Sequence, residues 1–339
     1  MVQNISGPST GPSNNNPIPE KNMTIWKTWL VTATLAAGLI GLCPEAYAKP
    51  VPAVRPTAPL VLYTDFGNQD GAVSEVKGVA YGVSQKLLIS DLSHLNPSDI
   101  FEGAYRLYQV APYWPKGTVF VTVIDPGVGT ARLSIVLKTK VGHYFVAPDN
   151  GLVTLIAEQE GIAEVRVIDE ATNRLPGSGK SHTFYGRDVF GYTGARLAAG
   201  VISFEQVGPV VSPDKLVRLP YKKAEFVSDA IAGDKITGLI PVLDVQYGNV
   251  WSDISRDLFD KLNIKIGDKV RVRFFHGDQL VDDLTAPYQN TFGEVPVGEP
   301  LVYINSLLNV AVALNQGNYA AAHHIGSGRD WFIEVTKAK

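Results

Sequence analysis

The residues best suited to chemistry lie together in one short segment. A β-branched apolar run over residues 118–124 ends at Asp125, and Pro-Gly-Val-Gly-Thr-Ala then leads to Arg132. The run is typical of a strand buried on both faces, and its proline and glycines favour a tight loop. We therefore expect the loop to bring Arg132, a permanent cation, back towards Asp125. The pair could belong to a ligand site at the carboxyl end of a parallel strand, or it could be an ion pair that only braces the loop.

The elements around this loop alternate between strand and helix. Apolar β-rich runs predict strands at 60–63, 87–92, 118–125, 134–139, 143–146 and 163–168. Helical spacing of apolar residues, with helix start and stop signals, predicts helices at 72–83, 96–110, 152–159 and 188–199. This alternation is typical of an α/β domain with a mostly parallel sheet and helices packed on it. We expect that N-terminal domain to span residues 59–208.

The pattern changes after residue 208. Residues 209–235 hold three prolines and mixed charge without clear periodicity, and we interpret them as a linker. Short β-rich runs between Gly, Asp and Pro turns follow, which predicts a smaller antiparallel, β-barrel-like domain over residues 236–336.

The first 48 residues are not expected to join either domain. Residues 1–22 are polar and rich in Asn, Pro, Ser and Gly, which predicts a disordered extension. Residues 23–48 have the features of a signal peptide: Lys27, an apolar run over 29–42, and a small-x-small cleavage site ending at Ala48. The apolar run is shorter than the roughly 20 residues that span a bilayer, so an uncleaved membrane anchor is the less favoured alternative. Cleavage after Ala48 implies a periplasmic or secreted protein.

Composition narrows the function further. The chain has 339 residues, 45% of them hydrophobic, and a formal net charge of -3. This length and hydrophobic content suit two folded domains, and the absence of a basic run argues against nucleic-acid binding. Cys43, the only cysteine, would be lost with the signal peptide. The sequence shows no zinc or nucleotide-loop signature, and we expect no membrane association after cleavage.

Four separated motifs together resemble the S-adenosylmethionine hydrolases, also called hydroxide adenosyltransferases, which are related to bacterial fluorinase and chlorinase. The motifs are Thr64-Asp65-Phe66-Gly67, the Asp125–Arg132 loop, Pro148-Asp149-Asn150-Gly151, and Asp244-x-x-Tyr247-Gly248-Asn249. The resemblance covers residues 59–335, with both domains in order. It implies that water or hydroxide attacks C5′ of S-adenosylmethionine, a small-molecule substrate, and releases adenosine and L-methionine. It further implies that the reaction uses no metal and no redox cofactor. It also implies a homotrimer whose active sites lie between the N-terminal domain of one subunit and the C-terminal domain of its neighbour.

The same resemblance assigns catalytic roles. Asp125 and Arg132 match the carboxylate and the cation beside the attacking water, where one accepts a proton and the other favours hydroxide. Hydrolases of the family often carry histidine in a motif that reads Thr183-Phe184-Tyr185-Gly186-Arg187-Asp188 in this chain, so Tyr185 occupies the third catalytic position. The pKa of a phenol is ordinarily about 10, so phenols are poor bases at neutral pH. The proton would therefore go to Asp125 alone or to nearby His182.

The remaining matched residues are expected to bind the substrate. Asp65 would accept the ribose hydroxyls, although an acid there could also cap a helix, and Phe66 would pack against the adenosine. In the C-terminal domain the expected contacts are Asp244 with the methionine ammonium, Tyr247 and Asn249 with the adenine, and Ser306 with the methionine carboxylate. The arginine that follows this serine in halogenases is Leu307 here.

Two other functions are compatible with parts of the pattern. A chlorinase-like halogenase would share Tyr185, but halogenases lack the Asp125–Arg132 pair and carry a halide-contacting serine where this chain has Gly186. A non-catalytic protein that binds S-adenosylmethionine or adenosine would explain the missing histidine, yet it would not need the pair. His94 has no second ligand at suitable spacing, and we interpret it as structural.

Overall fold

The fold is taken from a computed structural model, which describes residues 57–94, 97–231 and 233–338. All of these residues belong to one compact unit, Ala53–Lys339. The predicted extension at 1–22 and the predicted signal peptide at 23–48 lie outside the described residues. None of the helices in the described ranges is long and apolar enough to cross a membrane.

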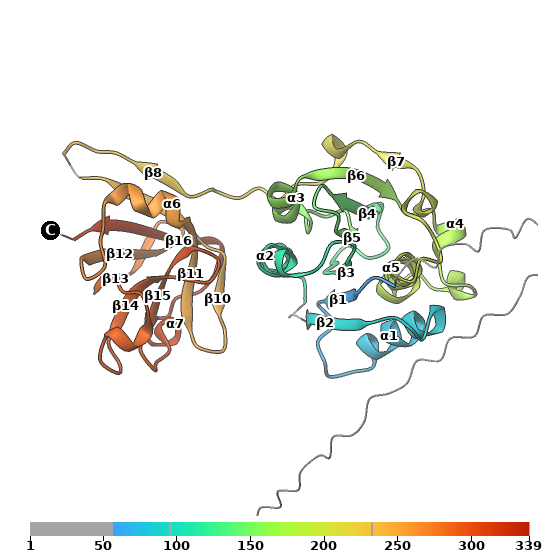
Figure 1. The fold of residues 1–339 in the computed structure, drawn as a ribbon, viewed down its shortest axis with the longest axis horizontal. Helices are drawn as coiled ribbons and strands as arrows, with labels where there is room; N and C mark the ends of the chain where they lie inside the picture. Colours follow the sequence, from blue (N-terminus) through green and yellow to red (C-terminus); the bar gives the residue numbers. More distant parts are fainter. Residues whose placement is uncertain (1–56, 95–96, 232, 339) are drawn as a thin grey trace, which may run out of the picture. The chain divides into compact units, whose positions relative to one another are not determined.

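The N-terminal half is built on a seven-stranded mixed sheet with the order β2-β1-β3-β5-β4-β6-β7 (Figure 1). Neighbours among β2, β1, β3 and β5 are parallel, and β4, β6 and β7 continue the sheet in antiparallel pairs. Every residue of β1 and β3 is buried, as expected for strands covered on both faces. The strands are β1 Leu60–Thr64, β2 Ile89–His94, β3 Val119–Val123, β4 Ser134–Thr139, β5 Tyr144–Pro148, β6 Ile162–Val167 and β7 Val210–Val211.

Helices cover both faces of this sheet. One apolar core joins Leu60 and Leu62 to α1 and α5, and the other joins Val61 and Tyr63 to α2 and α3. The alternation along β1 is the period of two that a strand imposes on its side chains. The helices are α1 Ala72–Val83, α2 Ile100–Val110, α3 Thr154–Glu160, α4 Glu170–Asn173 and α5 Tyr192–Ala198, with a π-helical segment, η3 Gly186–Gly191, running into α5.

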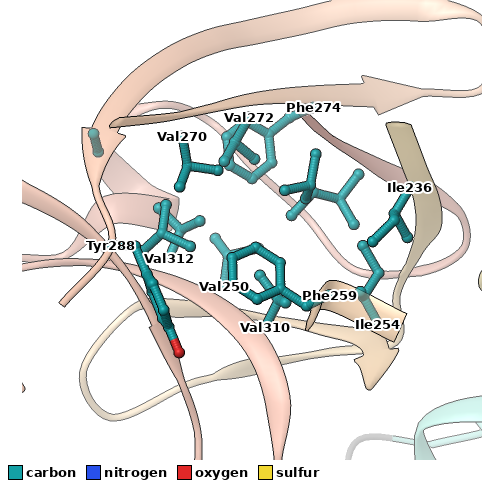
Figure 2. Close-up of a cluster of buried hydrophobic side chains, with 14 of the residues drawn as sticks. Ile236, Val250, Ile254, Phe259, Val270, Val272, Phe274, Tyr288, Val310 and Val312 are labelled. Atoms are coloured by element: carbon teal, nitrogen blue, oxygen red, sulfur yellow. The ribbon is translucent and has the colours of Figure 1, made fainter. Parts of the chain in front are cut away.

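The C-terminal half consists of two antiparallel sheets packed face to face, β10-β11-β15-β14 and β13-β12-β16-β9-β8. Val250, Val310 and Val312 from the first sheet meet Val272 and Phe274 from the second in one apolar core (Figure 2). The strands are β8 Glu225–Val227, β9 Lys235–Ile240, β10 Val242–Asp244, β11 Asn249–Ser255, β12 Lys269–His276, β13 Gln279–Pro287, β14 Pro300–Ile304, β15 Asn309–Leu314 and β16 Gly328–Lys337, and the helices are α6 Arg256–Phe259 and α7 Tyr319–Ala322. The predicted fold class, an α/β domain followed by an antiparallel β domain, is confirmed. The N-terminal sheet is mixed, because β4, β6 and β7 join it in antiparallel pairs.

The segment between the two halves pairs with both of them. β7 extends the N-terminal sheet beside β6, and β8 pairs with β9 in the C-terminal half. Short 3₁₀ turns lie in this segment and elsewhere, at Ala111–Tyr113, Ser178–Lys180, Phe204–Val207, Pro213–Lys215, Asp260–Leu262 and Phe292–Glu294.

A buried ion pair links the end of α3 to the start of β5. His143 Nδ1 lies 2.9 Å from Glu160 Oε1, and both side chains are almost fully buried. The Nε2 atom of His143 lies 3.0 Å from the carbonyl oxygen of Trp114. Burial lowers the pKa of His143, but the hydrogen bonds with Glu160 and Trp114 outweigh it, so the pKa is raised above its usual value.

We expect Glu160→Ala to lower the free energy of unfolding by about 3–5 kcal/mol, because it leaves the buried imidazole of His143 without its carboxylate partner. The matched control is Glu225→Ala, whose partner Lys222 lies 3.4 Å away at an exposed site, and which should cost less than about 1 kcal/mol. Urea unfolding at pH 6 measures both variants. Equal losses for the two would contradict a stabilising role for the buried pair.

Candidate active site

The loop after β3 returns Arg132 to Asp125, as the sequence predicted. Arg132 Nε lies 3.0 and 2.9 Å from the two carboxylate oxygens, and Nη2 lies 2.5 Å from Oδ2. The side chains are only 9% and 4% exposed, for the arginine and the aspartate respectively. The Gly127 amide also donates to Asp125 Oδ1, and Arg132 Nη1 donates to the Ser134 hydroxyl. Both charged groups are therefore held in one orientation before any substrate binds.

Glycine makes the tight loop possible. Gly129 has a φ of +78°, in the left-handed region that favours glycine. The Thr130 hydroxyl donates to the Gly127 carbonyl at 2.7 Å, which closes the turn ahead of Arg132. The backbone of His182 passes beside Gly129, but the His182 side chain is exposed.

Tyr185 meets the pair through the face of its ring. The guanidinium carbon of Arg132 lies 5.0 Å from the ring centroid, and that of Arg174 lies 4.8 Å from it. The Tyr185 hydroxyl has no hydrogen-bond partner among the described residues. The three residues predicted to be catalytic are thus brought together, and the ring of Tyr185 contacts two cations, Arg132 and Arg174.

Asp65 lies beside Asp125 at the carboxyl ends of two adjacent parallel strands, β1 and β3. The Ser98 amide donates to Asp65 Oδ2 at 2.9 Å. Burial raises the pKa of Asp65, and the negative charge of Asp125 raises it further. This edge of a parallel sheet is where α/β proteins bind ligands.

Phe66 packs against the segment that carries Tyr185. Its ring contacts Phe184 edge-on, with centroids 5.5 Å apart. A Cβ atom built on Gly186 would lie 2.5 Å from the tip of the Phe66 ring. A serine at position 186, as in halogenases, would therefore require Phe66 to move.

The sequence did not reveal a hydrogen-bonded chain behind Asp65 and Phe66. His94 Nδ1 lies 2.7 Å from the Thr64 hydroxyl, which accepts a hydrogen bond from the Phe66 amide at 3.3 Å. On its other side His94 Nε2 lies 3.3 Å from Asp91, which pairs with Lys77. These contacts support the first turn of the Asp65 loop. Pairing the first two predicted strands could have revealed this contact, because β1 and β2 place Thr64 opposite His94.

The predicted residues of the C-terminal half line a separate cavity of about 800 Å³. Asp244, Tyr247, Asn249 and Ser306 all belong to its wall. Asn249 Nδ2 donates to Asp244 Oδ2 at 3.1 Å, which fixes the carboxylate relative to the amide. The wall also holds aromatic residues that the sequence did not single out: Trp251, Phe292 and Tyr303.

The turn between Asp244 and Asn249 depends on glycine. The amides of Tyr247 and Gly248 both donate to the Asp244 carbonyl. Gly248 has a φ of +72°, and a Cβ atom there would clash with the side chain of Asn318. Tyr247 lies in this turn, and 66% of its surface is exposed.

The predicted site residues thus fall into two groups within one chain. Asp65, Phe66, Asp125, Arg132 and Tyr185 form the first, which we call the N-terminal group. All residues lining the second, the C-terminal cavity, lie between 244 and 318. Within the described ranges, no cluster of three or more His, Cys, Asp or Glu side chains could hold a metal ion.

The two halves of the fold match the two domains of a single protein family. Residues 60–208 match the SAM hydroxide adenosyltransferase N-terminal domain, and residues 238–332 match the C-terminal domain of the same family. The chain belongs to the SAM hydroxide adenosyltransferase family, SAM being S-adenosylmethionine, and is an enzyme of that family.

Named relatives include both hydrolases and a fluorinase. The chain is 43% identical to the (R)-S-adenosyl-L-methionine hydrolase of Methanocaldococcus jannaschii over 240 residues, covering 69% of this chain and 80% of the relative. It is 30% identical to a fluorinase of Actinoplanes sp. over 305 residues, covering 83% of this chain and 98% of the relative. A crystal structure of an uncharacterized conserved protein from Thermotoga maritima is similar with a TM-score of 0.74 and 33% identity, covering 82% of this chain and all of that one.

Proposed function

We propose that this enzyme hydrolyses S-adenosyl-L-methionine at C5′ to adenosine and L-methionine. The observation that carries the proposal is the Asp125–Arg132 pair, fixed by bidentate contacts beside Asp65. Asp65 accepts the ribose hydroxyls and thereby positions C5′. Arg132 stabilises the developing hydroxide, Asp125 accepts the proton of the attacking water, and the C5′–S bond breaks to release neutral methionine sulfur.

The C-terminal cavity would hold the rest of the substrate. Asp244 pairs with the methionine ammonium, Ser306 binds the carboxylate, and Tyr247 and Asn249 frame the adenine. In the displacement at C5′, the water oxygen bonds to that carbon as the C5′–S bond breaks, so the products are adenosine and L-methionine. The reaction needs no redox cofactor or metal in this scheme. From its signal-like N-terminus we further propose that the enzyme acts in the periplasm or outside the cell.

Incubation of the purified protein with S-adenosylmethionine, with and without chloride, tests the proposed reaction. We expect adenosine and methionine in equal amounts, at a rate that chloride does not change. A chlorinated nucleoside would indicate a halogenase instead, which the close fit of Gly186 against Phe66 disfavours. Tight binding without turnover would identify a binding protein and contradict the proposal.

We expect Tyr185→Phe to keep the hydrolysis rate within about tenfold of the native value, because the ring alone contacts Arg132 and Arg174. Tyr185→Leu should lower the rate further, since it removes cation–π contacts of about 0.5–2 kcal/mol that hold Arg132 in place. Initial rates of adenosine formation compare the two variants. A loss of equal size in both would instead assign the hydroxyl a direct part in the reaction.

We propose that the active site forms between subunits of a homotrimer, because the N-terminal group and the C-terminal cavity are separate within one chain. Asp125→Asn disables the first and Asp244→Ala the second. Co-expressed at equal levels, they should recover about one quarter of native activity, since that fraction of intersubunit sites joins two native halves.

The control for this experiment pairs Asp125→Asn with Arg132→Ala, which both damage the N-terminal group and so cannot complement each other. Light scattering on the same samples reports the number of subunits. Activity no higher than the sum of the separate variants would place the whole site within one chain.

A further inference from the structure

A second cavity, of about 400 Å³, lies where α2 and α3 meet the C-terminal sheets. Four aromatic side chains line it: Phe101, Tyr105, Tyr108 and Tyr221. Asp253 of β11 also lines the cavity, together with Leu239 and Leu258. The cavity contains none of the residues assigned above to the substrate of the hydrolase.

The walls of this cavity are held together by several contacts. Ala104, Tyr105 and Leu155 share an apolar cluster with Val242 and Trp251. Arg106 donates to the Leu243 carbonyl at 2.9 Å, and Asn309 donates to the Tyr105 hydroxyl at 3.5 Å. The helices and strands that line the cavity are therefore packed against one another.

Asp253 is a carboxylate without a cation. Its Oδ1 accepts a hydrogen bond from the Leu239 amide at 2.7 Å, and no Lys, Arg or His side chain in the described ranges forms an ion pair with it. Burial raises its pKa to about 7. Burial also raises the pKa of Tyr108, and the negative charge of Asp253 raises it further.

The two lysines in the wall are engaged elsewhere. Lys223 Nζ lies 2.8 Å from Glu158, and Lys261 Nζ lies 5.7 Å from the centroid of Phe226. Asp257 adds a second, exposed carboxylate to the wall. The cavity thus combines negative charge, aromatic rings and apolar surface, and its own cations do not neutralise Asp253.

We propose that this cavity binds a small organic cation, a protonated amine with an apolar body, whose ammonium group pairs with Asp253. The aromatic side chains receive the apolar body and add cation–π attraction. The Tyr108 hydroxyl, which has no hydrogen-bond partner among the described residues, offers an acceptor for a second ammonium N–H. The proposal is independent of the reaction assigned to the hydrolase site.

Calorimetric titration of the full-length protein at pH 8 with phenethylammonium, and with neutral 2-phenylethanol as its matched analogue, tests the proposal. We expect the amine to bind at least tenfold more tightly than the alcohol. Asp253→Asn, which keeps an acceptor for the Leu239 amide, should remove that preference. Asp283→Asn, at an exposed pair with Arg271, should leave it unchanged.

Two further variants separate this cavity from the substrate cavity. Tyr108→Leu should weaken binding of the amine at least threefold, because it removes a ring and an acceptor. Asp244→Asn should have no effect on it. Equal affinity for amine and alcohol, or a loss of amine binding in Asp244→Asn with retention in Asp253→Asn, would overturn the proposal.

Discussion

Asp125→Asn should leave the protein folded and lower kcat for hydrolysis of S-adenosylmethionine by about 10²–10⁴-fold, the usual contribution of a positioned general base. The amide has nearly the shape of the carboxylate and can still accept a hydrogen bond from Arg132. It cannot take up the proton of the attacking water, and it removes the charge that orients the guanidinium. We expect KM to change much less than kcat, because Asp65 and the C-terminal cavity, which grip the substrate in our proposal, are untouched.

The matched control for this variant is Asp169→Asn. Asp169 caps α4 by accepting a hydrogen bond from the Ala171 amide, and asparagine is an equally good cap. Rates should be compared at a temperature where circular dichroism shows both variants to be folded, because Asp125→Asn also alters a buried ion pair. If Asp125→Asn retained native kcat, the pair would only brace the loop, and the proposed mechanism would be wrong.

Local sequence patterns predicted the parts of the site that lie close together along the chain. Asp125 and Arg132 are separated by only six residues, and the tight Pro-Gly-Val-Gly turn between them brings their side chains into contact. The unbroken apolar run before Asp125 likewise predicted a strand covered on both faces. In both cases the deciding interactions, turn geometry and burial, act over a few residues.

The contacts that sequence reasoning did not reveal join residues far apart in the chain. Gly186 gives space to Phe66 across 120 positions, and no local rule connects them. The ring of Tyr185 lies against Arg174 as well as Arg132, so its role depends on packing that becomes visible only in the fold. The helix that we expected to start near residue 96 starts later, at Ile100. Asp99 is its N-cap and accepts a hydrogen bond from the Glu102 amide.

Asp253→Asn should stabilise the protein at pH 8 and leave its stability unchanged near pH 4. In the folded protein burial raises the pKa of Asp253 from 3.8 to about 7. The unfolded chain therefore ionises first, and the native protein loses stability as pH rises from about 4 to 7. A shift of this size corresponds to at most about 4 kcal/mol. Asparagine does not ionise, so the free energy of unfolding of the variant should exceed the native value by an amount that grows over this window and then levels off.

Asp283→Asn provides a control of opposite sign. The hydrogen bond from Arg271 lowers the pKa of Asp283 in the folded protein. The pair therefore stabilises the protein at a pH above the pKa that Asp283 has in the unfolded chain. This stabilisation is lost as the pH falls through the lower pKa of the folded protein. Urea unfolding of the native protein and both variants at pH 4, 6 and 8 separates the two trends. A gain for Asp253→Asn that did not depend on pH would show that its carboxylate stays ionised in the cavity. A saturating amine at pH 8 should narrow the difference in the free energy of unfolding between the native protein and Asp253→Asn, because the ammonium provides the cationic partner that the Asp253 carboxylate lacks.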